Sequence, residues 1–167
     1  TRSIAVTGVQ TCALPIYASF DELDIGTILK PRKNYEEHWK NTDFYAALEK
    51  YRPKEMLAHK DAVFMCTSAE DLDNCIGGEY IFEVIPDKRI ERHDLNWSSE
   101  VSCLVGDGAP EEKIKEAALN YWNGVPHHEP LWEYLTPKAI IKKVYLYDEY
   151  EDTIEVNKIK TYNKMKR

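Results

Sequence analysis

The sequence predicts an α+β fold, with a single domain, a mixed or split β core and short peripheral helices. The first observation is that short, apolar, strand-type runs and helical stretches interleave without a regular strand–helix–strand rhythm, which argues against a doubly wound parallel sheet. The second is the length of 167 residues, which is enough for one domain with a real core and too short for two of ordinary size.

The first half of the chain predicts a helical stretch followed by two strands. Apolar residues recur at near-helical spacing across residues 34–52. Thr42 is expected to cap a second helix within this stretch, and Pro53 to end it. The runs at 62–66 and 80–85 are short, apolar and rich in β-formers, so both are expected to be strands.

The middle of the chain gives a weaker pattern. Residues 89–100 are polar and aromatic with no clean period, so we expect a loop there, and residues 101–105 are expected to form a short strand. A short helix over 69–74, capped by Thr67 or Ser68, is expected after the first strand.

The strongest helix signal lies between Pro110 and Gly124. Pro110 suits a first helical turn, acidic residues follow it, and Gly124 suits a C-terminal cap. Apolar residues between them form one stripe. Two strand segments, at 131–135 and 139–146, are expected after this helix.

Composition excludes several functional classes. The chain has 22 basic and 29 acidic residues, a net charge of −7, which argues against general nucleic-acid affinity. No apolar run approaches the roughly 20 residues of a membrane helix. The cysteines are scattered without metal spacing, and the adjacent His127 and His128 cannot easily share one ion, so we expect no metal site. We expect a soluble, cytoplasmic protein of undetermined oligomeric state.

Residues 1–16 resemble the translation of a sequencing adapter. With one choice of codons, Val6 to Ile16 back-translates to a common adapter sequence. We therefore expect residues 1–16 to be foreign to the native protein. The rest of the chain would come from a gene fragment in mixed DNA that was translated through its adapter. The first base of codon 17 would come from the adapter, which leaves the native first base unknown. The native residue at Tyr17 would then be His, Tyr, Asn or Asp. The expected organisation is a domain at 17–150 and a charged C-terminal tail at 151–167.

The segment 17–29 resembles the start of the ADP-ribosyltransferase fold. Tyr17-Ala-Ser19 precedes Leu-x-x-Gly-x-x-Leu at 23–29, and this is similar to the rifampicin ADP-ribosyltransferases, where His-Gly-Thr stands at that spacing. The register places Tyr17 at the NAD-contacting His of that family. The resemblance implies that NAD is a substrate and that Ser19 bonds a nearby ribose or amide.

A second element compatible with this family is the strand at 62–66 with the hydroxyl residues that follow it. The family usually carries a Tyr where this chain has Phe64, which can stack on nicotinamide but cannot donate a hydrogen bond. The alternative is that Phe64 is an ordinary core residue. Arg52 and His59, which precede this strand, are either phosphate contacts or surface residues.

The family resemblance also implies an acid on a late strand, and Glu133 is the first candidate. A carboxylate there would stabilise the positive charge that develops on the ribose as nicotinamide leaves. The alternative is that Glu133 faces water between two aromatic neighbours. Asp94 is the second candidate acid. Arg92 and Trp97, in the same polar and aromatic segment, would approach the diphosphate and the base of NAD, or else tie a long loop to the body.

The sequence therefore favours an NAD-dependent ADP-ribosyltransferase whose acceptor it does not identify. The alternative is a non-catalytic binding domain that keeps the fold without the chemistry, such as a phage or mobile-element accessory protein. An enzyme requires residue 17, Phe64 and Glu133 to converge on one cleft.

Overall fold

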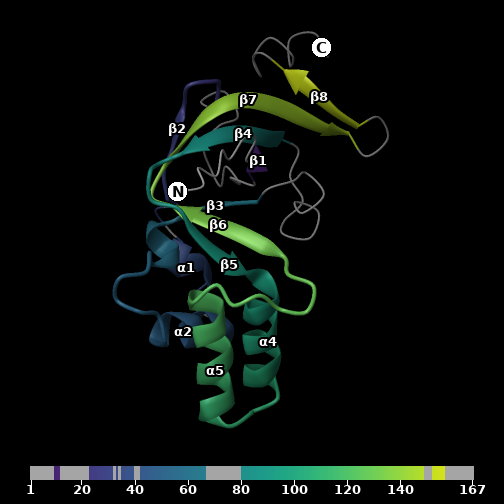
Figure 1. The fold of residues 1–167 in the computed structure, drawn as a ribbon. Helices are drawn as coiled ribbons and strands as arrows, with labels where there is room; N and C mark the ends of the chain where they lie inside the picture. The colour runs from purple at the N-terminus through teal and green to yellow at the C-terminus, as the bar shows by residue number, and fades with distance from the viewer. Residues whose placement is uncertain are drawn as a thin grey trace, which may run out of the picture. The chain divides into compact units, whose positions relative to one another are not determined.

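A computed structural model shows an α+β protein, as the sequence predicts, and its sheets are antiparallel (Figure 1). It describes residues 10–11, 23–31, 33, 35–39, 42–66, 80–148 and 152–156. The chain divides into two compact units and crosses between them after residues 30, 63, 88 and 137. The first unit comprises residues 1–30, 64–88 and 138–167, and the second comprises 31–63 and 89–137.

The first unit is built on an antiparallel sheet. Its strand order is β1-β4-β7-β2, with β8 paired to β7. Along β4 and β7, which lie side by side in Figure 1, buried side chains such as Phe82, Val84 and Val144 supply the core. The strands are β1 (Gln10–Thr11), β2 (Ile28–Leu29), β4 (Tyr80–Pro86), β7 (Ala139–Asp148) and β8 (Asp152–Val156).

Strands β1 and β8 lie in the two segments that the sequence sets apart from the domain, 1–16 and 151–167. Gln10 and Thr11 pair with Glu83 and Phe82 of β4, so these two residues of the segment 1–16 are part of a sheet edge. An edge strand presents unpaired backbone groups that accept an extended chain with little regard to its side chains. Residues 152–156, which lie within the predicted charged tail at 151–167, pair with β7 as β8.

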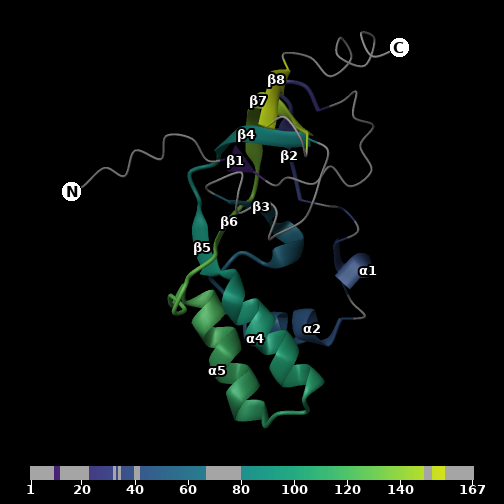
Figure 2. The same ribbon diagram turned by 90° about the vertical axis from the view of Figure 1, so that its right-hand side faces the viewer.

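The second unit combines helices with strands of a second sheet. That sheet has the order β3-β6-β5, and the boundary between the units falls within β3, after Val63. Helices α4 and α5 lie side by side in both ribbon views (Figures 1 and 2). The elements are α1 (Tyr35–Trp39), α2 (Asp43–Lys50), η2 (His59–Asp61), β3 (Val63–Met65), β5 (Glu91–Asp94), α4 (Leu95–Gly106), α5 (Glu111–Trp122) and β6 (Trp132–Thr136).

Several predicted boundaries are confirmed. Thr42 is the N-cap residue of α2, although its hydroxyl donates to the Trp39 carbonyl at 2.6 Å rather than capping an amide of α2. Helix α5 begins directly after Pro110, and Gly124 follows its end with a φ of 61°. The expected strands at 62–66, 80–85, 131–135 and 139–146 are present as β3, β4, β6 and β7.

The loop expected at 89–100 and the strand expected at 101–105 are wrong. Residues 91–94 form β5, and a single helix, α4, runs from Leu95 to Gly106. Trp97, Val101, Leu104 and Val105 are spaced as one helical stripe that packs on the core of the second unit. The helical period is not apparent when residues 89–100 and 101–105 are considered as separate segments, because Trp97 is then separated from Val101, Leu104 and Val105.

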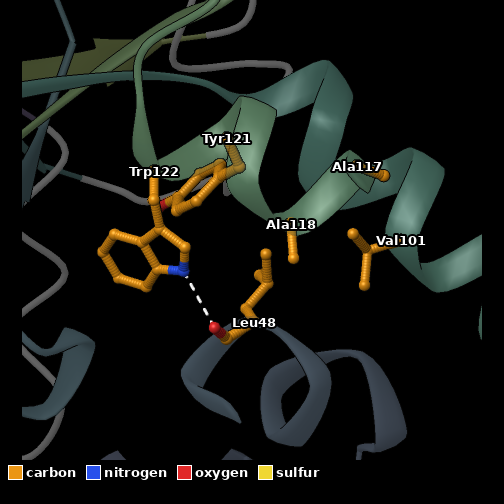
Figure 3. Packing of buried hydrophobic residues seen from close by; sticks show 6 residues of the cluster. All are labelled: Leu48, Val101, Ala117, Ala118, Tyr121 and Trp122. Atoms are coloured by element: carbon orange, nitrogen blue, oxygen red, sulfur yellow. Dashed lines mark hydrogen bonds between the residues drawn. The ribbon is translucent and has the colours of Figure 1, made fainter. Parts of the chain in front are cut away.

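The core of the second unit is formed where α2, α4 and α5 meet (Figure 3). Leu48 of α2 contributes both its side chain and its carbonyl oxygen, which accepts a hydrogen bond from Trp122 Nε1 at 2.8 Å. This bond satisfies the indole N–H of a buried tryptophan. The buried members are Leu48, Val101, Ala117, Ala118, Tyr121 and Trp122.

Some expectations fall outside the described residues. They concern Tyr17, Ser19 and the short helix at 69–74. In the part of the chain that is described, no helix is both long and apolar enough to cross a membrane.

Candidate functional site

A buried acid–base cluster lies in the second unit. The antiparallel register of β5 and β6 places His93 opposite Glu133, so both side chains project from the same face of the sheet. Tyr121 of α5 meets them there. Its hydroxyl donates to Glu133 Oε1 at 2.6 Å, and its carbonyl oxygen lies 3.0 Å from His93 Nδ1. Glu133 is only 7% exposed, so the alternative in which it faces water is wrong.

The Tyr121 hydroxyl also contacts His59 of η2, which extends the cluster towards α2. His59 Nε2 lies 2.7 Å from Tyr121 Oη, and His59 Nδ1 lies 3.3 Å from Glu49 Oε1. The backbone N–H of His59 donates to the same Glu49 oxygen at 3.0 Å. Arg52 Nε donates to the other oxygen, Glu49 Oε2, at 2.8 Å. Side-chain hydrogen bonds therefore connect Glu133 to His59 through Tyr121, and the backbone amide of His59 connects it to Glu49.

The structure gives His59 and Arg52 roles other than the phosphate contacts or surface residues that the sequence suggests. His59 is 4% exposed, so it is a core residue rather than a surface contact for phosphate. Arg52 donates to Glu49 and to the Met56 carbonyl at 2.7 Å, and it thereby holds the outer end of the cluster.

Aromatic rings enclose the cluster. The His59 ring stacks on Trp122 with centroids 4.8 Å apart, and the His93 ring stacks on Tyr121 at 4.7 Å. Tyr35 and Tyr45 lie beyond His59, with ring centroids at 6.4 and 5.9 Å. These rings replace water around the ionisable groups, so electrostatic interactions there are stronger than at a surface.

Burial shifts the pKa values of the cluster. It raises the pKa of Glu133 to about 7, an effect that the Tyr121 hydrogen bond partly offsets. Burial, together with the nearby His93 and Arg52, lowers the pKa of His59 to about 3, and burial also lowers the pKa of His93. Burial and Glu133 raise the pKa of Tyr121 well above its usual value. At neutral pH both histidines are therefore uncharged, and Glu133 is present in both its protonated and its ionised forms.

Asp94, the second candidate acid, is engaged with the backbone. It is 0% exposed, and its carboxylate accepts hydrogen bonds from three backbone amides. Asp94 Oδ1 accepts from Asn96 N at 3.1 Å, which caps α4, and from Leu131 N at 3.0 Å. Asp94 Oδ2 accepts from His127 N at 2.7 Å. These bonds account for the burial of Asp94 without any ligand.

The remaining candidates lie in different places. The exposed Arg92 lies over the Trp132 ring, with its guanidinium carbon 4.1 Å from the centroid. Trp97 donates from Nε1 to the Val125 carbonyl at 2.8 Å. Phe64 is half-buried on β3 and belongs to the first unit, whereas Glu133 belongs to the second. The convergence of residue 17, Phe64 and Glu133 stays a prediction.

Sequence reasoning missed Tyr121 and Glu49, and it grouped His93 with Arg92, Asp94 and Trp97 in a polar and aromatic segment rather than with Glu133. Tyr121 lies within the apolar stripe of the 111–122 helix, where an aromatic residue indicates packing rather than chemistry. Glu49 follows a buried leucine on α2 and has the appearance of a solvated helix residue. Only the register of β5 on β6 pairs His93 with Glu133, and β5 itself was expected to be loop.

Comparisons with known proteins add no family assignment. No model of a known family matches the chain, and no curated protein matches it significantly. Among the described residues, no group of three or more histidine, cysteine or acidic side chains is placed to hold a metal ion.

Proposed function

We propose that the chain is an NAD-binding protein with an ADP-ribosyltransferase-like fold that transfers ADP-ribose to an acceptor, with Glu133 as its catalytic acid. The observation that carries the proposal is the state of Glu133. It occupies the late strand on which the family resemblance expects an acid, and it is buried against Tyr121 with a pKa raised to about 7. A buried carboxyl group that is poised to ionise at neutral pH is typical of functional sites.

The chemistry follows from the charge that develops during the reaction. As the bond between nicotinamide and ribose breaks, the electron pair leaves with nicotinamide and the ribose becomes cationic. An ionised Glu133 would stabilise that cation, most strongly in surroundings that exclude water. Because Tyr121 holds Oε1 at 2.6 Å, Oε2 is the oxygen that would face the ribose. Since burial raises the pKa of Glu133 to about 7, we expect the rate to rise with pH through that value.

The proposal is tested by NAD binding and by release of nicotinamide. The full chain would be prepared as it stands and with Tyr17→His, the residue that the family resemblance implies. NAD at about 100 times its dissociation constant should stabilise the protein by about 2.7 kcal/mol in a thermal-shift measurement. Glu133→Gln should abolish nicotinamide release, whereas Glu116→Gln, which alters an exposed carboxylate on α5, should leave it unchanged.

A second function, a non-catalytic binding domain, is favoured by one observation. Each described polar candidate already has an intramolecular partner: Asp94 binds backbone amides, Trp97 a carbonyl, Arg92 a ring and Glu133 a hydroxyl. On this account, NAD stabilises neither the unmodified chain nor the Tyr17→His variant, and nicotinamide is not released. That pair of results, in protein that unfolds cooperatively, would replace the enzymatic proposal with the binding domain.

A further inference from the structure

We infer that Tyr121 is a positioning residue for Glu133, and that His59 sets the direction in which the Tyr121 hydroxyl donates. When Glu133 is ionised, His59 Nε2–H donates to the Tyr121 hydroxyl, which in turn donates to Glu133 Oε1. This arrangement fixes Oε1 and leaves Oε2 as the oxygen that acts. The inference rests on the proposed function in one respect, which is the reaction that Glu133 serves.

The direction of the two hydrogen bonds follows from the number of protons available. An ionised carboxylate only accepts, so the Tyr121 hydroxyl, 2.6 Å from Glu133 Oε1, donates its single proton there. The same hydroxyl lies 2.7 Å from His59 Nε2, and at that contact it can only accept, because its proton is already used. Neutral His59 therefore carries its proton on Nε2.

Packing fixes the position of the Tyr121 hydroxyl. The buried Tyr121 ring stacks on His93, with ring centroids 4.7 Å apart. The rings of Trp122 and His59 meet it edge-on, at interplanar angles of 83° and 69°. Since the ring is held from several directions, its hydroxyl has one place from which to donate, and placing a catalytic carboxylate requires such support.

The other ionisable groups near Glu133 and His59 leave this assignment intact. His93 of β5 is the register partner of Glu133, and its Nδ1 lies 3.0 Å from the Tyr121 carbonyl oxygen. A carbonyl only accepts, so neutral His93 carries its proton on Nδ1. The two buried histidines are therefore expected to have opposite tautomers. The titratable and charged groups that face His59 from the other side are Tyr35, Tyr45, Glu49 and Arg52.

The tautomer of His59 tests the direction of donation. It is read from the ring ¹⁵N chemical shifts of the full chain, labelled at histidine, at about pH 9, where Glu133 is ionised. We expect the proton on Nε2 in His59 and on Nδ1 in His93, which is the internal control. A proton on Nδ1 of His59 would overturn the assignment, because Tyr121 would then receive no hydrogen bond from it.

Removing the hydroxyl tests the bond to Glu133. Tyr121→Phe deprives the ionised carboxylate of its donor, so the midpoint of the Glu133 carboxyl ¹³C titration should rise by about one pH unit or more. Tyr45→Phe is the matched control, because it removes the hydroxyl of a buried tyrosine whose ring faces His59, and it should leave the midpoint near 7. An unchanged midpoint in Tyr121→Phe would show that Tyr121 does not hold Glu133. If that variant does not fold, the His59 tautomer decides the question.

Nicotinamide release tests whether the bond positions Glu133 for the reaction. The rates are compared above the raised midpoint, where Glu133 is ionised in both proteins. Tyr121→Phe should lower kcat by roughly 10- to 100-fold and leave KM for NAD unchanged, because Tyr121 acts through Glu133. An unchanged kcat would overturn the positioning role and leave Glu133 as the proposed acid. Both NMR experiments omit NAD, so if they succeed while the unmodified chain releases no nicotinamide, the proposed function fails and the hydrogen-bond arrangement stands.

Discussion

At the scale of single residues, the burial of Glu133 links stability to pH. Because burial raises its pKa from 4.5 to about 7, the folded state binds the Glu133 proton more tightly than the unfolded state does. The contribution of this group to stability is therefore fully present below about pH 4.5 and is lost as the pH rises through about 7. The difference between the two pKa values corresponds to about 3 kcal/mol.

Glu133→Gln should remove this dependence. Relative to the unmodified chain, we expect the free energy of unfolding of the variant to be larger by about 3 kcal/mol at about pH 8 than at about pH 4.5, since the amide is never ionised. Urea unfolding at both pH values measures it. Glu116→Gln is the matched exposed control and should show no such change. If Glu133→Gln and the unmodified chain differ in their free energy of unfolding by the same amount at both pH values, Glu133 ionises with an ordinary pKa in the folded protein.

His59 changes the stability with pH in the opposite direction to Glu133. The effect of Glu133 is therefore measured by comparing Glu133→Gln with the unmodified chain. Its pKa is lowered from 6.5 to about 3, so its contribution to stability is present above about pH 6.5 and is lost as the pH falls towards 3. Between about pH 4.5 and 6.5 the effects of Glu133 and His59 oppose each other. We therefore expect the stability of the unmodified chain to change less over this pH range than either group alone would make it change.

Asp94→Asn should destabilise the fold. The variant keeps one acceptor oxygen but turns the other into an N–H donor, which then faces a backbone amide such as that of His127. We expect a loss of about 1–3 kcal/mol in the free energy of unfolding, measured with urea, because a buried donor loses its partner. Asp107→Asn, at the exposed C-terminal end of α4, should change it by less than about 0.5 kcal/mol. If the two variants behave alike, Asp94 is not the structural residue that its three bonds indicate.

At the scale of elements, the end of α5 depends on a glycine. Gly124 has a φ of 61°, and a Cβ at this position would lie 2.7 Å from the Arg92 carbonyl oxygen of β5. Gly108 has nearly the same φ, 63°, with nothing within 4 Å of such a Cβ. Both glycines therefore adopt a positive φ, but only at Gly124 would an added Cβ approach another backbone atom closely.

Gly124→Ala should cost more stability than Gly108→Ala. We expect about 1 kcal/mol for Gly108→Ala from the backbone conformation alone, and at least about 1 kcal/mol more for Gly124→Ala, since backbone must move to make room. Urea unfolding of both variants gives the difference directly. Equal costs would show that β5 and the end of α5 are not held at this distance.

The sequence predicts elements well where the local signals are complete. Pro110 and Gly124 bound α5 correctly, and the short apolar runs are strands. It fails for α4 because Trp97 and Val101 were assigned to different elements, and for β8 because an acidic run carries no strand period. For the candidate site, the family resemblance pointed to Glu133 but not to Tyr121, whose hydroxyl has its role only after α5 docks on the β5–β6 face.

At the scale of the whole molecule, each unit is assembled from segments that are distant in sequence. The second unit joins residues 31–63 to 89–137, and it contains all four tryptophans, Trp39, Trp97, Trp122 and Trp132. Tryptophan fluorescence therefore reports the unfolding of the unit that holds the acid–base cluster. No single cut in the sequence separates the two units, so the predicted domain at 17–150 stays a prediction.

Deleting residues 1–16 tests the expectation that they are foreign. Their described part, Gln10 and Thr11, pairs only along the edge of the β4 strand. We expect the deletion to leave the tryptophan-detected midpoint unchanged and to lower the overall free energy of unfolding by no more than about 1 kcal/mol. Loss of cooperative unfolding would instead show that this edge strand is an integral part of the first unit.

The measurement that tests the central claim most directly is the pKa of Glu133 in the folded chain, from the ¹³C shift of its carboxyl carbon, with Glu133→Gln to assign the signal. A titration midpoint near 7 is predicted, because burial beside Tyr121 disfavours the charged form. A midpoint near the ordinary value of 4.5 would contradict the buried acid–base cluster, and with it the proposed catalytic role of Glu133.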